Sequence, residues 1–295
     1  MTSGVPPERG QRAVAPLGLT LVATPIGNLG DLSPRALEVL GAVDAVLCED
    51  TRVTGQMLAR YGASAPLLPL HDHNEAEMVP RILDRLRAGQ RLALASDAGT
   101  PLVSDPGYRL VRAVIAAGLP ITAIPGPNAA VMALTLSGLP PHPFLFLGFL
   151  PAKAGPRQAE IATLRAVERA GLKAALIFYE APHRLAEALA ALAEGLGADR
   201  PAAVARELTK RFEEVRRGTL GDLAAHYAAA EALGEICIVV GPASKEPTGE
   251  ADLDARLRDA LKGASLRDAA ALVAAATGLP RKQVYARALE IARDA

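Results

Sequence analysis

Apolar runs of strand length alternate with longer stretches of helical periodicity along the chain from Leu19 onward. Short apolar runs bounded by turn residues are typical of buried strands, and apolar positions repeating with the helical period are typical of amphipathic helices. The pattern predicts strands at residues 19–23, 45–48, 67–70, 92–96, 121–123 and 144–147, and helices at 33–40, 77–88, 103–117 and 128–137. Because strands that alternate with helices usually form a parallel sheet, we expect an α/β domain with a mainly parallel sheet.

A breaker-rich segment, Gly138-Leu139-Pro140-Pro141-His142-Pro143, interrupts this pattern. We therefore expect the first domain boundary there or just past Pro151. A second alternation follows, with predicted strands at 174–178, 202–205, 214–218 and 235–240 and predicted helices near 157–170, 184–196 and 221–231. The sequence thus predicts a first α/β domain over residues 19–143, a second over 151–242, and a linker over 241–247.

The C-terminal segment, residues 250–295, has helical patterns and no predicted strand. Ser265 fits a helix N-cap, Gly278 fits the glycine that ends a helix, and Pro280 fits the position where a proline opens the next one. Two short helices joined by such a turn resemble a helix-turn-helix. A small helical cap or a dimerisation element explains the pattern equally well, so both interpretations stay open.

The N-terminal residues, the apolar runs and the cysteines indicate the cellular compartment. Residues 1–18 lack the apolar core of a signal peptide and are expected to form a flexible tail. No apolar run approaches the ~18–20 residues that a membrane span needs. The two cysteines, Cys48 and Cys237, each lie inside an apolar run, which excludes a disulfide framework and favours a reducing compartment. A soluble cytoplasmic protein is the expectation.

The charge composition alone does not decide whether the protein binds nucleic acid. The chain has 32 basic and 32 acidic residues, so its net charge is zero, and this excludes a basic coat but not a local patch. Aromatic residues are scarce, at 3%, which argues against a platform of stacked bases. The densest basic run lies in residues 206–217, where a solvated strand edge is an equally good interpretation.

The common catalytic motifs are absent. The chain has no Walker A sequence, no G-x-G-x-x-G after the first predicted strand and no G-x-S-x-G elbow. His71-Asp72-His73 has too few neighbouring ligands for a metal site and is interpreted as a polar turn. We therefore expect no resident metal.

Four loops instead have the composition of a ligand-binding site. Each follows a predicted strand and is rich in glycine, proline and small polar residues, and together they cover residues 23–31, 48–52, 96–107 and 124–130. The carboxyl ends of parallel strands meet at one edge of a sheet, where ligands bind. Glycine lets the backbone approach a ligand closely, and proline lowers the entropic cost of ordering a loop. The sequence therefore predicts a small-molecule site at this edge.

A family resemblance rests on these loops and on two later segments. The segments ATPIGNLGD, CEDTR, SDAGTPLVSDPG, IPGPNAA, YEAPHRL and ARELTKRFEE resemble the signature set of the ribosomal RNA small subunit methyltransferase I family, within the tetrapyrrole methylase superfamily. The match runs from about residue 19 to residue 242. The resemblance implies two α/β domains of the tetrapyrrole methylase type plus a small C-terminal helical extension.

The resemblance also implies S-adenosylmethionine as the methyl donor, bound in the cleft between the α/β domains of a homodimer. The loop at residues 96–100 would hold its methionine end, and the loop at 127–129 its adenosine. The residues implied for the cofactor are Pro25, Ile26, Gly27, Asp97, Ala98, Gly99, Thr100, Asn128, Ala129, Phe178 and Tyr179. The implied substrate is a cytidine ribose in small-subunit ribosomal RNA, methylated on its 2′-oxygen in the assembled 30S subunit.

Methylating a neutral ribose hydroxyl requires a base within hydrogen-bond reach or a cation that stabilises the developing alkoxide. Candidates in the second-domain motifs are Glu180, His183, Glu207 and Lys210, and the sequence does not choose among them. For each one taken singly, a structural ion pair or a solvated side chain is the more common explanation. RNA phosphates are expected to contact Arg206, Lys210 and Arg211.

Two other functions remain open at this stage. A small-molecule methyltransferase acting on a tetrapyrrole suits the neutral charge, and a non-enzymatic helix-turn-helix regulator suits the C-terminal helices. For an RNA methyltransferase of zero net charge, we expect weak, salt-sensitive binding to free RNA and a preference for a folded ribosomal surface.

Overall fold

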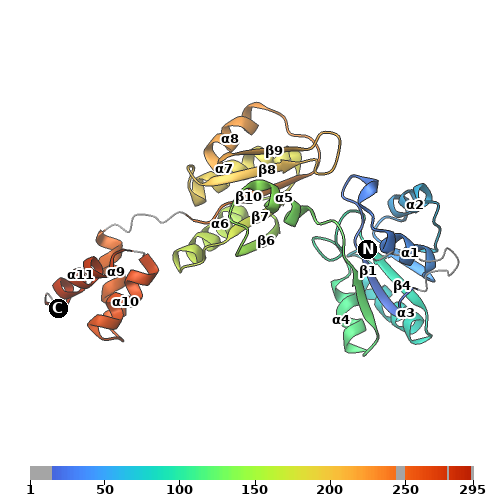
Figure 1. Ribbon diagram of the computed structural model, residues 1–295, viewed down its shortest axis with the longest axis horizontal. Coiled ribbons are helices and arrows are strands. Elements are labelled where there is room, and N and C mark those ends of the chain that lie inside the picture. Colours follow the sequence, from blue (N-terminus) through green and yellow to red (C-terminus); the bar gives the residue numbers. More distant parts are fainter. Residues whose placement is uncertain (1–14, 244–249, 278, 294–295) are drawn as a thin grey trace, which may run out of the picture.

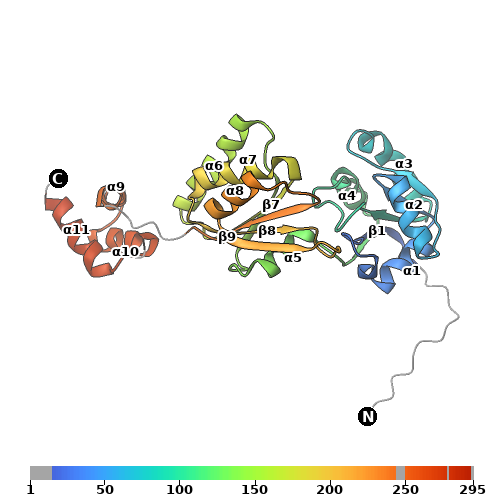
Figure 2. The same cartoon turned by 90° about the horizontal axis from the view of Figure 1, so that it is seen from above.

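The computed structural model describes residues 15–243, 250–277 and 279–293, and these form two α/β units followed by a helical unit (Figure 1). Each α/β unit contains a five-stranded sheet, and the described helices of the third unit pack around an apolar cluster of their own (Figure 2). The predicted fold class, two α/β units with a C-terminal helical extension, is confirmed.

The first sheet is entirely parallel, as predicted, with strand order β3-β2-β4-β1-β5. Its strands are β1 (Gly18–Val22), β2 (Ala45–Cys48), β3 (Leu67–Pro69), β4 (Arg91–Ala95) and β5 (Ile121–Ile124). The helices of this unit are η1 (Leu29–Asp31), α1 (Pro34–Ala42), α2 (Thr51–Arg60), α3 (Glu75–Arg87) and α4 (Tyr108–Ala116).

Both faces of the first sheet are buried. Successive residues of β1, β2 and β4 alternate between two apolar clusters, so that Ala93 joins one and Leu94 the other. Helices α1 and α2 supply the first cluster, and α3 and α4 supply the second. This double burial explains why the strands read as continuous apolar runs in the sequence.

The second sheet is mixed, with strand order β6-β7-β10-β8-β9. Only the β6–β7 pair is parallel. Its strands are β6 (Phe144–Phe149), β7 (Ala175–Glu180), β8 (Pro201–Arg206), β9 (Glu214–Thr219) and β10 (Ile236–Val240). Helices α6 (Ala154–Arg169), η2 (Pro182–Arg184), α7 (Leu185–Leu196) and α8 (Leu220–Ala229) connect them.

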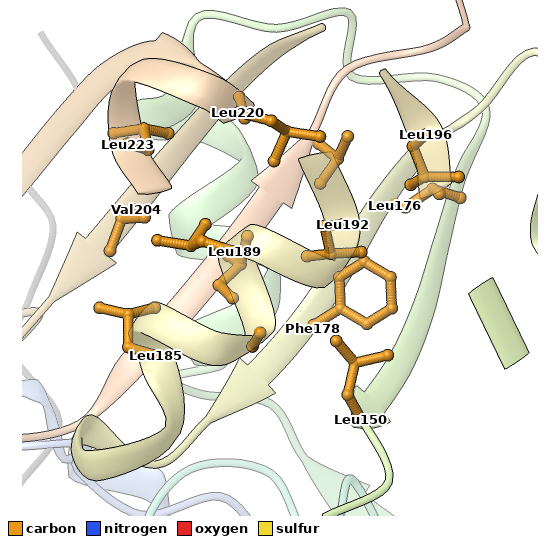
Figure 3. Close-up of a cluster of buried hydrophobic side chains, with 14 of the residues drawn as sticks. Leu150, Leu176, Phe178, Leu185, Leu189, Leu192, Leu196, Val204, Leu220 and Leu223 are labelled. Carbon is orange, nitrogen blue, oxygen red and sulfur yellow. The ribbon is translucent and has the colours of Figure 1, made fainter. Parts of the chain in front are cut away.

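The leucine-rich core of this unit lies between the second sheet and its helices (Figure 3). Phe178 and Leu176 of β7 point into it, and Leu189 and Leu192 of α7 pack against them (Figure 3). Burying each such side chain contributes about 1.5–3 kcal/mol, so this cluster is a large source of stability for the second unit.

The opposite face of the second sheet is covered by α5 (Ala129–Ser137), which the sequence had placed in the first domain. Ala130, Ala133 and Leu134 pack on Ile177 and Val239. The chain therefore passes from one sheet to the other at residues 125–128, earlier than the predicted boundary at residue 143. Helix α5 is apolar on nearly all sides, so its pattern could not show which sheet it would cover.

Smaller differences have local causes. Helix α2 was not predicted, and α4 begins at Tyr108 rather than near residue 103 because Ser104 and Gly107 have positive φ angles. Ala15 is buried in the apolar cluster that α1 and α2 supply. The flexible tail predicted for residues 1–18 therefore does not include Ala15. Residues 1–14 lie outside the described residues, as does most of the predicted linker at 241–247.

The third unit consists of α9 (Glu250–Leu261), α10 (Leu266–Thr277) and α11 (Arg281–Arg293) around an apolar cluster of their own. The hydroxyl of Ser265 accepts the Asp268 amide at 3.2 Å, as an N-cap does, and α11 begins one residue after Pro280. Gly278, predicted to end a helix, lies outside the described residues. Across the described residues, no helix combines the length and apolar character needed to cross a bilayer.

Candidate active site

The loops that follow the strands of the first sheet are joined by hydrogen bonds at its carboxyl edge, as the parallel arrangement predicted. Thr24 and Gly99 exchange backbone hydrogen bonds of 2.8 and 3.1 Å. The Thr100 hydroxyl donates to the Pro127 carbonyl at 2.9 Å, and the Asp50 amide donates to Asp97 Oδ1 at 3.2 Å. The four loops therefore form one connected surface.

This surface forms one wall of a cavity of about 400 Å³, and the second sheet forms the other. A volume of this order is typical of small-molecule sites. The first wall contains Ile26, Ala98, Gly99, Thr100, Val103, Ser104 and Asp105. The second contains Ala129, Phe149, Tyr179, Glu180, Ala181, Pro182, Ala205, Leu208, Gly234, Glu235, Ile236 and Cys237.

Six of the residues predicted for the cofactor line this cavity. They are Ile26, Ala98, Gly99, Thr100, Ala129 and Tyr179. Gly99 has a φ of +83°, and a Cβ atom there would lie 3.2 Å from the Ile26 side chain. The backbone of residues 98–100 can therefore approach a ligand where a larger residue could not.

Two further predicted cofactor residues, Asp97 and Asn128, instead shape the surrounding loops. Asp97 accepts the Asp50 amide, and Asn128 Oδ1 caps α5 by accepting the Val131 amide at 3.1 Å. Pro25 does not line the cavity either. Asp97 and Asn128 thus hold the loops that form the cavity wall.

The prediction that Phe178 faces the cofactor is wrong. Its ring is fully buried in the leucine-rich core, on the face of the second sheet that α6, α7 and α8 cover (Figure 3). Neighbouring residues of a strand point to opposite faces, so Phe178 and Tyr179 cannot both reach the cavity. Tyr179 does reach it, and its ring packs edge-on against Phe146 and Phe149 at 4.8 and 5.7 Å between centroids.

Gly27, also predicted for the cofactor, meets the second unit instead. A Cβ atom at this position would overlap Lys210 Cγ, and the next amide, of Asn28, donates to Thr209 Oγ1 at 3.0 Å. Thr209 adopts a φ of +66°, in the left-handed region that a β-branched residue rarely occupies. The loop after β8 is therefore fixed against the loop after β1, beside the cavity.

Two catalytic candidates, Glu207 and Lys210, belong to this contact. Lys210 Nζ lies 2.8 Å from Glu207 Oε1 and 3.0 Å from Glu235 Oε2. Glu207 also accepts the Glu235 amide at 3.0 Å, and the Lys210 hydrogen bond lowers the pKa of Glu207. A Cβ atom on Gly234 would overlap the Glu207 carboxylate. These charges are committed to one another and hold the loop.

Glu180 is the one sequence-predicted catalytic candidate that lines the cavity. Its side chain is fully buried, it accepts the Ala181 amide at 2.8 Å, and its Oε1 lies 3.2 Å from Arg184 Nε. Arg184 also donates to the Leu150 carbonyl. Burial raises the pKa of Glu180 in spite of this ion pair.

The remaining candidates lie outside the cavity lining. His183 is exposed on η2. Arg206 is paired with Glu214 at 3.0 Å, whereas Arg211 is exposed and lies 5.6 Å from the ring centroid of Phe212. Phe212 is itself 66% exposed. Of the residues predicted to contact RNA, Arg211 is thus the one most available.

Sequence reasoning missed Asp105, which lines the cavity from the loop between β4 and α4. Burial, followed by the nearby charges of Glu49 and Asp97, raises its pKa from 3.8 to about 7. The available signal was the second half of SDAGTPLVSDPG, which lies in the same loop as the predicted residues 97–100.

The lining has a clear electrostatic character. Its charged side chains are the three carboxylates Asp105, Glu180 and Glu235, and the described lining contains no lysine, arginine or histidine. Apolar groups such as Phe149 and Ile236 make up most of the remaining wall. This combination fits a ligand with a cationic centre and an apolar or aromatic portion, as a sulfonium nucleoside has. The described residues contain no group of three side chains arranged to hold a metal ion.

Comparison with known proteins places these observations in a family. The profile of the Tetrapyrrole (Corrin/Porphyrin) Methylases matches residues 18–224, and the RsmI C-terminal HTH domain profile matches residues 247–292. Proteins named Ribosomal RNA small subunit methyltransferase I are similar along most of the chain. The one from Mesorhizobium japonicum is 51% identical over 92% of each chain, and the one from Xylella fastidiosa is 49% identical over 90% of this chain and 97% of its own.

Solved structures agree on the fold. A uroporphyrin-III-C-methyltransferase from Thermus thermophilus has a TM-score of 0.51 at 25% identity and covers 76% of this chain and 93% of its own. The methyltransferase CobJ has a TM-score of 0.58 at 22% identity over 77% of this chain and 94% of its own. A second structure, named uroporphyrin-III C-methyl transferase from Thermus thermophilus complexed with S-adenyl homocysteine, has a TM-score of 0.52 at 18% identity and covers 76% of this chain and 96% of its own.

Proposed function

The chain belongs to the ribosomal RNA small subunit methyltransferase I family of the tetrapyrrole methylases, and we propose that it methylates small-subunit ribosomal RNA with S-adenosylmethionine. The proposed acceptor is the ribose 2′-hydroxyl of a cytidine in the assembled 30S subunit. With this substrate, the enzyme would act in the cytoplasm. The observation that carries the proposal is the acidic cavity between the two sheets, lined by the Ala98-Gly99-Thr100 loop of the family's signature.

The residues that line the cavity fit the proposed cofactor. Ile26, the backbone of residues 98–100, Ala129 and Tyr179 would hold it, and the carboxylates of the lining would favour its positive charge. When bound, the cofactor supplies an already activated methyl group. The task of the protein is then to align the acceptor oxygen with the methyl carbon, exclude water and accept a proton.

The proposed RNA-binding side is the loop between β8 and β9, next to the cavity wall. Leu208 of this loop lines the cavity, and Arg211 and Phe212 are exposed a few residues further on. An arginine beside an aromatic ring can contact a phosphate while the ring stacks on a base. Arg206 and Lys210, which the sequence also predicted for RNA, are held in ion pairs and would act by positioning this loop.

A homodimer is the proposed assembly, on the basis of the family resemblance. Strand β6 is at an edge of the second sheet and carries Phe144, which is 42% exposed. An exposed apolar edge strand is a common place for another chain to pack. Sedimentation equilibrium should report twice the chain mass of 30.6 kDa. A monomer at micromolar concentration would contradict this assembly.

The activity is tested with labelled S-adenosylmethionine and 30S subunits from a strain that lacks the enzyme. We expect transfer to 30S subunits exceeding transfer to naked 16S RNA, and mass mapping should place the label on one cytidine ribose. Incorporation into neither substrate would overturn the proposal. Transfer to a porphyrinoid instead would favour the small-molecule alternative, which the 25% identical uroporphyrin enzyme represents.

A further inference from the structure

One aromatic ring in the cavity wall has an open face. Phe149, at the end of β6, lines the cavity and is 54% exposed. Its ring lies 5.7 Å from that of Tyr179 between centroids, with 65° between the two ring planes. An edge-to-face contact of this kind covers at most one face of a ring, so Tyr179 leaves at least one face of Phe149 uncovered. The cavity wall therefore offers a flat apolar surface to a ligand.

The backbone holds this ring in place before a ligand binds. After a bulge in β6, Phe149 is paired with Tyr179 of β7. The next residue, Leu150, points into the leucine-rich core, and its carbonyl accepts a hydrogen bond from Arg184 (Figure 3). Because the chain is fixed on both sides of the ring, a ligand that stacks on it loses little affinity to ordering of the protein.

Phe149 lies at the rim of the cavity, where the two α/β units approach each other. A Cβ atom on the preceding residue, Gly148, would lie 3.5 Å from the hydroxyl of Ser104 in the first unit, and Ser104 is exposed. Ile236 and Cys237 of the same lining are each only 4% exposed. The open ring is therefore on the solvent side of the cavity, where a second molecule would approach a cofactor held inside.

We propose that Phe149 stacks on the nucleobase of the acceptor nucleotide, an inference that rests on the proposed function. The 2′-hydroxyl of a ribose is on the carbon next to the one that carries the base. A ribose that reaches the methyl donor therefore brings its base to the cavity rim. In folded RNA this base must first leave its stacked neighbours, which costs free energy. Stacking on an exposed aromatic ring offsets part of that cost.

Two other groups could cover the same ring, namely the adenine of the cofactor and a second copy of the chain packed on the β6 edge. The position of the ring favours the acceptor base over the adenine. Ile26 and Gly99, which the family resemblance implies for the cofactor, are buried, whereas about half of Phe149 faces solvent. The experiments below distinguish all three occupants.

The first test is the Phe149→Leu variant of the full chain, which keeps an apolar side chain of similar bulk and removes the ring. Methylation is measured at steady state on 30S subunits from a strain that lacks the enzyme. We expect kcat/KM for 30S subunits to fall ~10-fold, mostly through KM, as loss of one base–aromatic stack does. Affinity for S-adenosylhomocysteine, measured by calorimetry, should stay within ~3-fold of the wild type.

Two variants control this test. Phe149→Tyr keeps the ring and should restore most of the wild-type kcat/KM. Tyr108→Leu removes another exposed ring, on α4 and outside the cavity lining, and should behave as the wild type.

Each other outcome has one meaning. An unchanged kcat/KM in Phe149→Leu, with active wild-type enzyme, overturns the role of the ring and leaves the proposed function intact. An equal loss of S-adenosylhomocysteine affinity assigns the ring to the adenine, and a changed mass in sedimentation equilibrium assigns it to a contact between subunits. Both results overturn the proposal. An inactive wild-type enzyme overturns the proposed function itself, and the next experiment still tests the ring.

The second test needs no turnover. The chain contains no tryptophan, so Phe149→Trp places a single indole at the cavity rim. With S-adenosylhomocysteine bound, a cytidine-containing single-stranded RNA oligonucleotide should quench the indole fluorescence by stacking on it, and S-adenosylhomocysteine alone should not. Tyr108→Trp is the matched control and should not respond. Quenching by S-adenosylhomocysteine alone, an equal response at both positions, or no response to the oligonucleotide would overturn the proposal.

Discussion

At the residue scale, burial of the Asp105 carboxylate has a stability cost that unfolding experiments can measure. The pKa of Asp105 in the folded protein is about 7, above its ordinary value of 3.8. Between these two pH values the folded state binds more protons than the unfolded chain. The free energy of unfolding therefore falls as pH rises through this window, which is the reverse of the usual behaviour of a paired carboxylate.

Asp105→Asn is accordingly expected to stabilise the protein at pH 8. Removing the buried charge should raise the free energy of unfolding by about 2 kcal/mol, since partial exposure to solvent screens part of the cost. Urea unfolding at pH 5, 6, 7 and 8 measures this, and the variant should show a flatter pH dependence than the wild type. A variant that is less stable than the wild type at pH 8 would contradict the assigned ionisation.

The contact of Gly27 with Lys210 gives a second prediction at this scale. In Gly27→Ala the new methyl group overlaps Lys210 Cγ, so the loops after β1 and β8 must separate. Overpacking of this kind costs about 1–3 kcal/mol, and we expect cofactor affinity to fall with it. Calorimetry measures the affinity. In a Lys210→Ala background the effect of Gly27→Ala should be smaller, and an equal effect in both backgrounds would locate the cause elsewhere.

At the element scale, strand alternation decides which aromatic residue of β7 serves the site. Phe178 lies in the leucine-rich core and Tyr179 lines the cavity (Figure 3). Phe178→Ala should cost about 3–5 kcal/mol of unfolding free energy, as other buried phenylalanines do. Tyr179→Ala should instead weaken cofactor binding with a smaller loss of stability. Urea unfolding and calorimetry on both variants check this, and the reverse pattern would refute the assignment.

The sequence was sufficient to predict most of the strands and the loops that follow them. Most strands were predicted within one or two residues because burial on both faces of the first sheet produces uninterrupted apolar runs. The four loops were found because each follows such a strand. Periodicity could not assign α5 to a sheet, because an all-round apolar helix fits either one. Because side chains alternate between the two faces of a strand, assigning Tyr179 to the cofactor site would have excluded Phe178 from it.

The site residues show a different limit. Recognising Asp105 requires knowledge of its burial and of its distance from Glu49 on another loop, and neither can be read from the sequence around it. Glu207 and Lys210 looked catalytic because they are charged residues in a long signature. Their partner Glu235 lies far away in the sequence. Only the three-dimensional structure shows that Lys210 forms ion pairs with both Glu207 and Glu235.

At the scale of the whole molecule, the C-terminal unit is separable in its packing. The buried residues of its apolar cluster belong to α9, α10 and α11, and none of the described residues of this unit lines the cavity. A chain ending at residue 243 should therefore bind S-adenosylhomocysteine as tightly as the full chain. We expect its methylation of 30S subunits to fall by ~10-fold or more, since a second contact with RNA raises the effective concentration at the site.

Calorimetry and filter-based methylation measure the two properties of the truncated chain. Loss of cofactor affinity would mean that the helices support the cavity from a distance. Undiminished methylation would make them dispensable for substrate recognition, and the helix-turn-helix profile that matches residues 247–292 would then describe a shape without an RNA-binding role.

The order of the strands has a consequence for how the protein is made. Strand β10 is the last strand in the chain, yet it lies between β7 and β8 in the second sheet. The first sheet has all its strands once residue 124 has left the ribosome, whereas the second stays split until residues 236–240 emerge. The same late segment supplies Glu235 and Cys237 to the cavity. During synthesis, the proposed methyl-donor site can therefore form only after the second sheet closes, so cofactor binding would report the folding of both α/β units.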